Sequence, residues 1–266
     1  MTADLHTLLT PRPAAPSTYG VTVPNGWQQG RGAFGGFVVG CLVRALEASE
    51  PEPERKLRSL TAELCGPVVP GPAEITVEVL RRGSGLSTLA ARLTQGAEVL
   101  AHAVGLLGKT RGEPSRRNYL AMPVLRPWQA VPVTPVQPPL GPPFARFFEM
   151  RNTGPAPFSG GTEPFVSGWI RPVEPGIGRG AAYLAACADA WWPASFSTWS
   201  EPRPVGTIAY TLEITGSFEG LDPEAPLFHQ ARIVAEHDGY LVEMRELWGE
   251  DGRLMALNQQ TIAVIR

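Results

Sequence analysis

The stretch GGFVVGCLVRALE, residues 35–47, is apolar on nearly every side of a helix, and Arg44 is the only charge in its interior. A helix that is apolar all round is buried rather than docked on a surface. Gly35, Gly36 and Gly40 carry no side chain, so other parts of the chain can approach closely. We therefore expect this helix at the centre of a core, with the rest of its domain wrapped around it.

The segment after this helix predicts an antiparallel sheet. Ile75, Val77 and Val79 alternate with polar residues, which is the period of two of a half-buried strand. Short turns containing glycine join this run to its neighbours, a pattern typical of an antiparallel meander. The strands expected here are residues 57–64, 73–80, 86–93 and 99–107.

The C-terminal part of the chain repeats this plan. Residues 180–192 read GAAYLAACADAWW, a second helix of small and apolar residues, and residues 207–218, 227–236, 241–248 and 254–265 are the expected strands. An antiparallel sheet curled around one buried helix is the hotdog fold. We predict a double hotdog, an α+β fold of two antiparallel sheets each wrapped around a buried helix. Joining the sheets edge to edge would protect their open strand edges.

The domain boundaries follow from composition. The 29 glycines and 28 prolines exceed the average share and predict many turns and an irregular connector. We expect a partly ordered segment at 1–24, an N-terminal hotdog at 25–112 and a C-terminal hotdog at 166–266. The proline-rich connector is residues 113–165, with one strand at 146–150.

Charge and composition exclude several classes of protein. The net charge is −2, the pI is about 6.1 and the arginines are scattered, which argues against a nucleic-acid binder. No apolar run reaches the roughly 18–20 residues of a membrane span, and the first ten residues, without Lys or Arg, predict no signal peptide. Cys41, Cys65 and Cys187 lie far apart in apolar surroundings, so we expect buried free thiols in the cytoplasm, no metal and no cofactor.

Of two familiar motifs, one has a plain explanation and the other is absent. Residues 30–35 match GxGxxG, but no apolar strand precedes them and an antiparallel meander follows, so a glycine-rich entry to the buried helix is favoured over a dinucleotide site. No GxSxG elbow is present. His102 and His229 have no carboxylate beside them in sequence, and we expect them to be surface or hydrogen-bonded residues.

Asp189 is the only charge between Arg179 and Glu201. If it is buried, desolvation raises its pKa toward the value a general base needs, although an exposed Asp near the helix end fits the composition equally well. Gln260 lies in an apolar strand and needs amide partners if buried, whereas its neighbour Gln259 points to the opposite face.

The run RGAFGGFVVG, residues 31–40, resembles the entry to the first helix in the acyl-CoA thioesterase II family of double-hotdog enzymes. The resemblance covers about residues 25–110 and 175–266. It implies hydrolysis of acyl-CoA to a carboxylic acid and CoA, by a water that an Asp–Thr–Gln triad holds. The matching residues here are Asp189, Thr207 and Gln260. After the Thr and the Gln this chain departs from the common family pattern, with Ala209-Tyr210-Thr211 and Thr261-Ile262, which bears on acyl-chain preference and activity.

The internal repeat sets Val43 opposite Asp189, Leu57 opposite Thr207 and Gly105 opposite Gln260. The polar trio thus belongs to one half only, as expected if one repeat carries the chemistry.

The mechanism that this resemblance implies has Asp189 as general base, without a covalent intermediate. The Gly36 N–H is the candidate oxyanion donor. The expected substrate-binding residues are Gly35, Gly36, Phe37, Trp191 and Trp192, although core packing is the more frequent role of a buried aromatic. A hotdog hydratase or dehydratase and a non-catalytic acyl-CoA or lipid-binding protein are the alternatives. We expect a homo-oligomer, because hotdogs present extended sheet edges.

Overall fold

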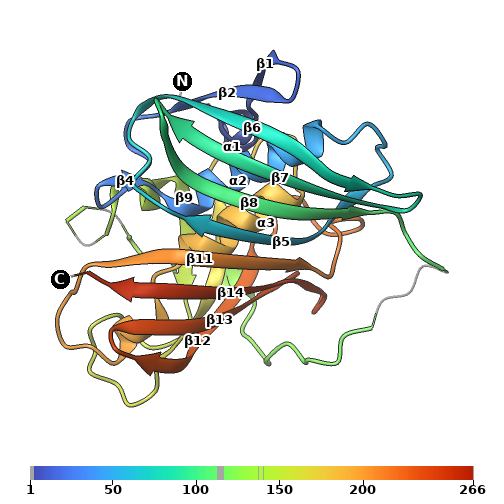
Figure 1. Ribbon diagram of the computed structural model, residues 1–266. Helices are drawn as coiled ribbons and strands as arrows, with labels where there is room; N and C mark the ends of the chain where they lie inside the picture. The colour runs from blue at the N-terminus through green and yellow to red at the C-terminus, as the bar shows by residue number, and fades with distance from the viewer. Residues whose placement is uncertain (1–2, 113–116, 137, 140, 266) are drawn as a thin grey trace.

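The chain forms one twelve-stranded antiparallel sheet that curves around two helices, α2 (Gly35–Ala48) and α3 (Ala181–Ala190) (Figure 1). The computed structural model describes residues 3–112, 117–136, 138–139 and 141–265. The N-terminal half of the sheet lies above the C-terminal half in Figure 1, and β5 and β11 join them. This is the expected arrangement of two hotdogs joined edge to edge.

The order of the strands in the sheet is the same from either end. The N-terminal half runs β1 (Arg12–Ala15), β2 (Thr18–Val23), β6 (Gly71–Arg82), β7 (Leu86–Gln95), β8 (Glu98–Gly108) and β5 (Lys56–Leu64). The C-terminal half continues with β11 (Val205–Ile214), β14 (Leu254–Val264), β13 (Tyr240–Trp248), β12 (Leu227–His237), β10 (Phe165–Pro172) and β9 (Phe148–Asn152). Each strand of this sheet has a counterpart in the other half, so the chain is an internal repeat at the level of its structure, and only the short pair β3 (Gln28–Gln29) and β4 (Gly32–Ala33) stands outside it among the described strands.

The register at the junction identifies the counterparts residue by residue. β5 and β11 pair antiparallel, with Thr61 opposite Thr211. Asp189 is the ninth residue of α3 and Val43 the ninth of α2. Counting outward from these positions along the pairing of β11 with β14 and of β5 with β8 matches Thr207 with Leu57 and Gln260 with Gly105.

The two central helices touch because small residues face each other. A Cβ built on Gly36 would lie 3.0 Å from the Cα of Ala186, so any larger residue would separate the helices. Both helices are buried along nearly their whole length, including Phe37 and Val43 of α2 at 0% exposure. An apolar surface on every side therefore produces the central position that the sequence predicts.

The first 24 residues are more regular than expected. They contain a short helix, α1 (Leu5–Leu9), and strands β1 and β2. Tyr19, Val21 and Val23 alternate inward from β2 and pack in the core. The alternation is short and its flanks are rich in Pro and Thr, which concealed the strand in the sequence.

The expected connector also contributes to the sheet. Its predicted strand at 146–150 is observed two residues later as β9, and a 3₁₀ helix, η2 (Pro143–Phe147), precedes it. The sequence analysis missed β10 altogether. Residues 128–130 form the 3₁₀ helix η1 (Trp128–Ala130), and nearby Val131 packs on Trp169, Phe228 and Trp248. Residues 122–131 of the connector therefore pack on the outer face of the C-terminal half.

Cys65 differs from the expectation of three buried thiols. Cys41 and Cys187 are buried and free, whereas Cys65 is free and exposed. Leu60 and Ala62 point inward from β5, so the alternation of the strand turns Cys65 outward.

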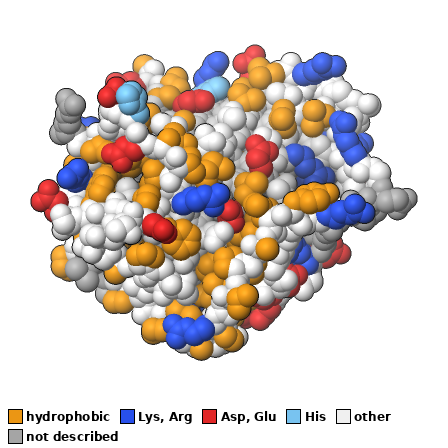
Figure 2. Space-filling model, turned by 90° about the horizontal axis from the view of Figure 1, so that it is seen from below, with side chains coloured by type: hydrophobic (Ala, Val, Ile, Leu, Met, Phe, Trp, Pro, Cys, Tyr) orange, Lys and Arg blue, Asp and Glu red, His pale blue; other side chains and the backbone are white. Residues whose placement is uncertain are grey.

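The surface carries charges of both signs among hydrophobic side chains, as the view from below shows (Figure 2). Among the helices that the structure describes, none is long and apolar enough to cross a membrane.

Candidate active site

The carboxylate of Asp189 lies at the junction of the two helices. Asp189 is near the end of α3, and its side chain meets the first turn of α2, where the Gly36 N–H donates a hydrogen bond to it. A Cβ built on Gly35 would lie only 2.7 Å from Asp189 Oδ2. The glycine pair therefore lets the carboxylate reach the N-terminus of α2, where the free N–H groups of the helix favour a negative charge.

Gln260 and Thr207 complete a chain of side chains that ends on this carboxylate. Gln260 Nε2 donates to Asp189 Oδ1 at 2.9 Å, and Thr207 Oγ1 donates to Gln260 Oε1 at 2.8 Å. Gln260 is fully buried, Asp189 is 7% exposed and Thr207 is half-buried. The three predicted residues come together, and Thr207 is the member nearest the solvent.

Asn258 fixes the orientation of the Gln260 amide. Gln260 Nε2 also donates to Asn258 Oδ1 at 3.0 Å, and Asn258 Nδ2 in turn donates to the carbonyl of Thr211. Both N–H groups of Gln260 thus have acceptors, which leaves Oε1 to face the hydroxyl of Thr207.

A buried ion pair lies behind the carboxylate. Arg245 Nε donates to Glu243 Oε1 at 2.6 Å, and Arg245 Nη1 lies 3.9 Å from Asp189 Oδ1. Arg245 also donates to the carbonyl of Ala188, and Glu243 Oε2 accepts the N–H of Ala194 at 2.7 Å. Two side chains of β13 thereby hydrogen-bond the backbone before and after Asp189, which fixes the position of Asp189.

Burial dominates the electrostatics of Asp189. Desolvation raises the pKa of the carboxyl above its ordinary value, and the Arg245 charge and the hydrogen bonds from Gln260 and Gly36 partly offset this effect. The pKa of this carboxyl is raised, and the positive charge of Arg245 still favours its ionised form. Both properties fit a general base.

The N-terminal half has no comparable set of polar groups at the matching positions. Gln260 pairs with Glu243 across β14 and β13, as Gly105 pairs with Leu89 across β8 and β7. Continuing this correspondence matches Arg245 with Ala91 and Asn258 with Ala103. The inward polar residues of the C-terminal half are thus replaced by apolar or small ones.

The expected substrate-binding aromatics are mainly core residues. Phe37 is fully buried and packs against Trp27, with ring centroids 6.0 Å apart. Trp191 is buried between Trp192 and His229, whereas Trp192 is half-buried. Of the expected residues, Gly35 and Gly36 touch the Asp189 carboxylate.

The histidines lie outside this chain of hydrogen bonds. His229 is fully buried and stacks on Trp191, and burial lowers its pKa well below the ordinary value, with the charge of Arg245 adding to the effect. His102 pairs with Glu63 at 3.0 Å on the sheet surface. Among the residues that the structure describes, no group of three or more His, Cys, Asp or Glu could hold a metal ion.

Sequence reasoning missed Asn258, Glu243 and Arg245. A usable signal was present, because Glu243 and Arg245 are two residues apart in one strand, as are Asn258 and Gln260 in another. Residues at i and i+2 of a strand share a face. Four polar side chains on the inward faces of two neighbouring strands indicate a buried polar site.

The fold and the site define a double-hotdog protein with a buried Asp–Gln–Thr chain in one half. Residues 23–108 match the family model of the acyl-CoA thioesterase N-terminal domain, and residues 125–264 match that of the acyl-CoA thioesterase C-terminal domain. The chain belongs to the acyl-CoA thioesterase family, which confirms the resemblance and supports thioester hydrolysis as the general activity.

Solved structures confirm the fold. A conserved hot dog protein of unknown function from Alicyclobacillus acidocaldarius has a TM-score of 0.87 and 23% identity, covering 100% of this chain and 99% of the other. A tesB protein of Mycobacterium avium subs paratuberculosis has a TM-score of 0.78 and 14% identity, covering 98% of each chain. The acyl-CoA thioesterase II TesB2 of Mycobacterium marinum has a TM-score of 0.76 and 16% identity, again covering 98% of each.

Dehydratase domains also share the fold at lower TM-scores, so the fold by itself does not separate hydrolysis from dehydration. No curated protein sequence matches this chain significantly.

Proposed function

We propose that this protein hydrolyses acyl-CoA thioesters with Asp189 as general base on a water that Thr207 and Gln260 orient. The observation that carries this proposal is the continuous chain of hydrogen bonds from the half-buried Thr207 through Gln260 to the buried carboxylate. These residues belong to a protein of the acyl-CoA thioesterase family, which also supports the proposal.

The hydrogen-bond donors of Thr207 and Gln260 are already used within the site, and this determines how a water would bind. Thr207 gives its only proton to Gln260, and both N–H groups of Gln260 are used by Asp189 and Asn258. The hydroxyl oxygen, the amide oxygen and the carboxylate can therefore only accept further hydrogen bonds. A water held there donates one proton to Asp189 and the other to Thr207 or Gln260 Oε1. Its lone pair is then free to attack the thioester carbonyl.

The reaction balances with this one base. As the water oxygen bonds to the carbonyl carbon, Asp189 takes a proton from it. The carbon–sulfur bond then breaks, and the CoA sulfur leaves as the thiol after receiving that proton. The ground-state Gly36 N–H donates to Asp189, so in this state it orients the base. Its expected role as an oxyanion donor would require that hydrogen bond to be exchanged.

Replacement of Asp189 by Asn tests the proposal. Asn keeps the shape and can accept the hydrogen bond from Gln260 through Oδ1, but it cannot take a proton from water, so turnover should fall by about 10²–10⁴-fold. The measurement is release of free thiol from acyl-CoAs of varied chain length.

Asp238→Asn is the matched control, because Asp238 is exposed in a turn with positive φ, which Asn tolerates. It should retain full activity. Near-full activity in Asp189→Asn would remove Asp189 from the mechanism. Binding of acyl-CoA without thiol release at any chain length would favour a binding protein, and hydration of crotonyl-CoA without thiol release would favour a hydratase.

A further inference from the structure

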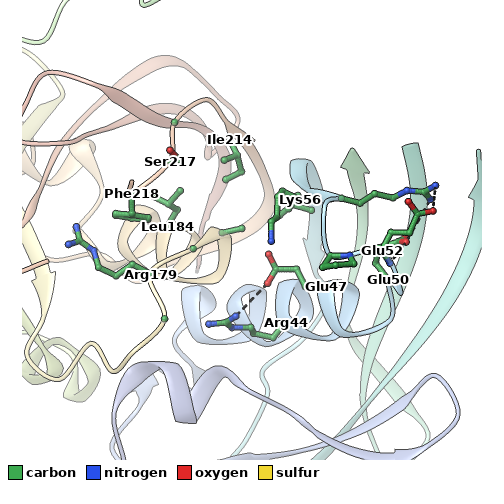
Figure 3. Close-up of a pocket in the computed structure, with 17 residues that line it drawn as sticks. Arg44, Glu47, Glu50, Glu52, Lys56, Arg179, Leu184, Ile214, Ser217 and Phe218 are labelled. Atoms are coloured by element: carbon green, nitrogen blue, oxygen red, sulfur yellow. Dashed lines mark hydrogen bonds and ion pairs between the residues drawn. The ribbon is translucent and has the colours of Figure 1, made fainter. Parts of the chain in front are cut away.

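A cavity of about 440 Å³ lies at the other end of the helix pair (Figure 3). It is bounded by the start of α3 at Gly180 and Ala181, by the last turns of α2 at Arg44 and Glu47, and by Leu57 of β5. Its volume falls within the roughly 300–1,000 Å³ typical of small-molecule sites.

The internal repeat makes this cavity the counterpart of the Asp189 site. Leu57, which lines it, matches Thr207. At the Asp189 site, a carboxylate from the neighbouring helix occupies the start of α2. At the cavity the matching residue is Val43, so the repeat supplies no carboxylate to the start of α3. No side chain caps that helix either.

The charges on the two walls differ. On the α2 wall, carboxylates neutralise the cations, with Arg44 and Glu47 at 3.6 Å and Arg55 and Glu52 at 2.8 Å. On the α3 wall, Arg179 forms no ion pair with any residue that the structure describes. Its Nη1 donates to the carbonyl of Asp222, but Nε and Nη2 are buried with no hydrogen-bond partner in the described part of the chain. Among the described residues no carboxylate neutralises this guanidinium, which lies over the rings of Phe218 and Tyr183, so this wall is suited to an anion.

The remaining lining is apolar. Phe218 and Leu184 lie next to Arg179, whose guanidinium carbon is 4.4 Å from the centre of the Phe218 ring, and Ile214 lies beyond Leu184 (Figure 3). A ligand that fits both features has an anionic head and an alkyl tail.

We propose that this cavity is a second, non-hydrolytic site that binds the carboxylate of a fatty acid, with Arg179 on the head group and Leu184, Ile214 and Phe218 along the chain. The choice of ligand rests on the proposed function, because a free fatty acid is the product of acyl-CoA hydrolysis. The cavity lacks counterparts of Thr207 and Gln260 and of the Asp189 carboxylate, so the groups proposed to activate water are absent from their matching positions. It is therefore expected to bind the acid without turning over the thioester.

Calorimetric titration of the full-length protein with decanoate, and with decan-1-ol as the uncharged comparison, tests this site. Decanoate should bind saturably and more tightly than decanol. Arg179→Gln should weaken decanoate binding by roughly tenfold or more, the loss expected for a charge-assisted hydrogen bond. Gly180→Leu should abolish it by filling the cavity. A Cβ on Gly180 meets nothing within 4 Å and its φ is extended, so this variant should fold.

Two further variants locate the ligand. Arg92→Gln removes an exposed charge that does not line the cavity, and Asp189→Asn alters the other site. Both should bind decanoate as the wild type does. The inference is overturned if wild type shows no saturable binding, if decanol binds equally well, or if Asp189→Asn abolishes binding while both cavity variants retain it. Failure of the proposed hydrolysis can be distinguished from failure of this inference, because hydrolysis is measured by thiol release and binding to the cavity by calorimetry.

Discussion

Gly35 positions the proposed base because it has no side chain. Asp189 Oδ2 occupies the space where a Cβ would be, and Leu64 Cδ1 lies 3.0 Å from the same point. Because two atoms crowd this position, the carboxylate has to move if a methyl group is added. The position of the Asp189 carboxylate therefore depends on the lack of a side chain at Gly35.

Gly35→Ala should reduce kcat for thioester hydrolysis by an order of magnitude or more, because a shift of about 1 Å at a reacting group can cost 10²-fold. Steady-state thiol release measures this, alongside thermal unfolding. Gly180→Ala is the matched control at the start of α3, where a Cβ meets nothing within 4 Å, and it should keep wild-type kcat. Equal activity in the two variants would show that the Asp189 carboxylate is not held by Gly35.

The raised pKa of Asp189 predicts the pH dependence of hydrolysis. The base works only when ionised, so kcat/KM should fall as the pH drops through a pKa above the ordinary 3.8. Arg245 lowers this pKa, so a variant without the Arg245 charge that remains folded should have its acid limb at higher pH. A pH profile of kcat/KM measures both effects. An acid limb at or below the ordinary pKa would contradict the assignment.

At the scale of elements, the sequence predicted eight strands and both helices correctly, because their periodicity is strong. The alternation of Ile75, Val77 and Val79 gives one face of β6, and α2 is apolar and buried on nearly every side except at Arg44 and Glu47 in its last turns. β2 and β10 were harder because they lie in segments rich in proline or glycine. Hydrogen bonds between distant strands, rather than local preference, hold them in the sheet.

The site shows the same limit. Asp189, Thr207 and Gln260 were found through a family resemblance, and their local sequence gives no reason for them to meet. The sheet register, which brings β14 between β11 and β13, is what places Gln260 beside both Thr207 and Glu243. A register involves pairs of strands, so the pattern within one strand does not reveal it.

β13 offers a test of the buried ion pair as a unit. Arg245→Gln should destabilise the protein by about 3–5 kcal/mol, because it leaves the carboxylate of Glu243 buried without its partner. The double variant Glu243→Gln with Arg245→Gln should be destabilised by less than the sum of the two single changes. Urea unfolding of the four proteins gives the coupling free energy. Strict additivity would mean that the two side chains do not depend on each other.

For the whole molecule, the repeat separates the roles of its two halves. The same sheet order and helix pair occur twice, but the inward positions carry Asp, Thr, Glu, Arg, Asn and Gln in one half and Val, Leu, Leu, Ala, Ala and Gly in the other. A polar network is stable in a core only when its members satisfy one another. One carboxylate introduced into the apolar half should therefore behave quite differently from Asp189.

Val43→Asp places a carboxylate at the counterpart of Asp189, where Leu57, Ala91 and Gly105 stand in place of Thr207, Arg245 and Gln260. Val43 is fully buried, so the charge should destabilise the protein by several kcal/mol, an effect that the start of α3 and Arg179 offset only in part, without adding thioesterase activity. Burial raises the pKa of the new carboxyl in the folded state above its unfolded value, so the folded protein binds the proton more tightly. The destabilisation is then full at pH values above the folded pKa and shrinks as the pH falls toward the unfolded one. Thermal unfolding of Val43→Asp and of Val43→Asn across this pH range measures the effect. If the difference between the two variants does not change with pH, the carboxylate has found partners or water in the N-terminal half, and the assignment of all the charge-stabilising groups to the C-terminal half is wrong.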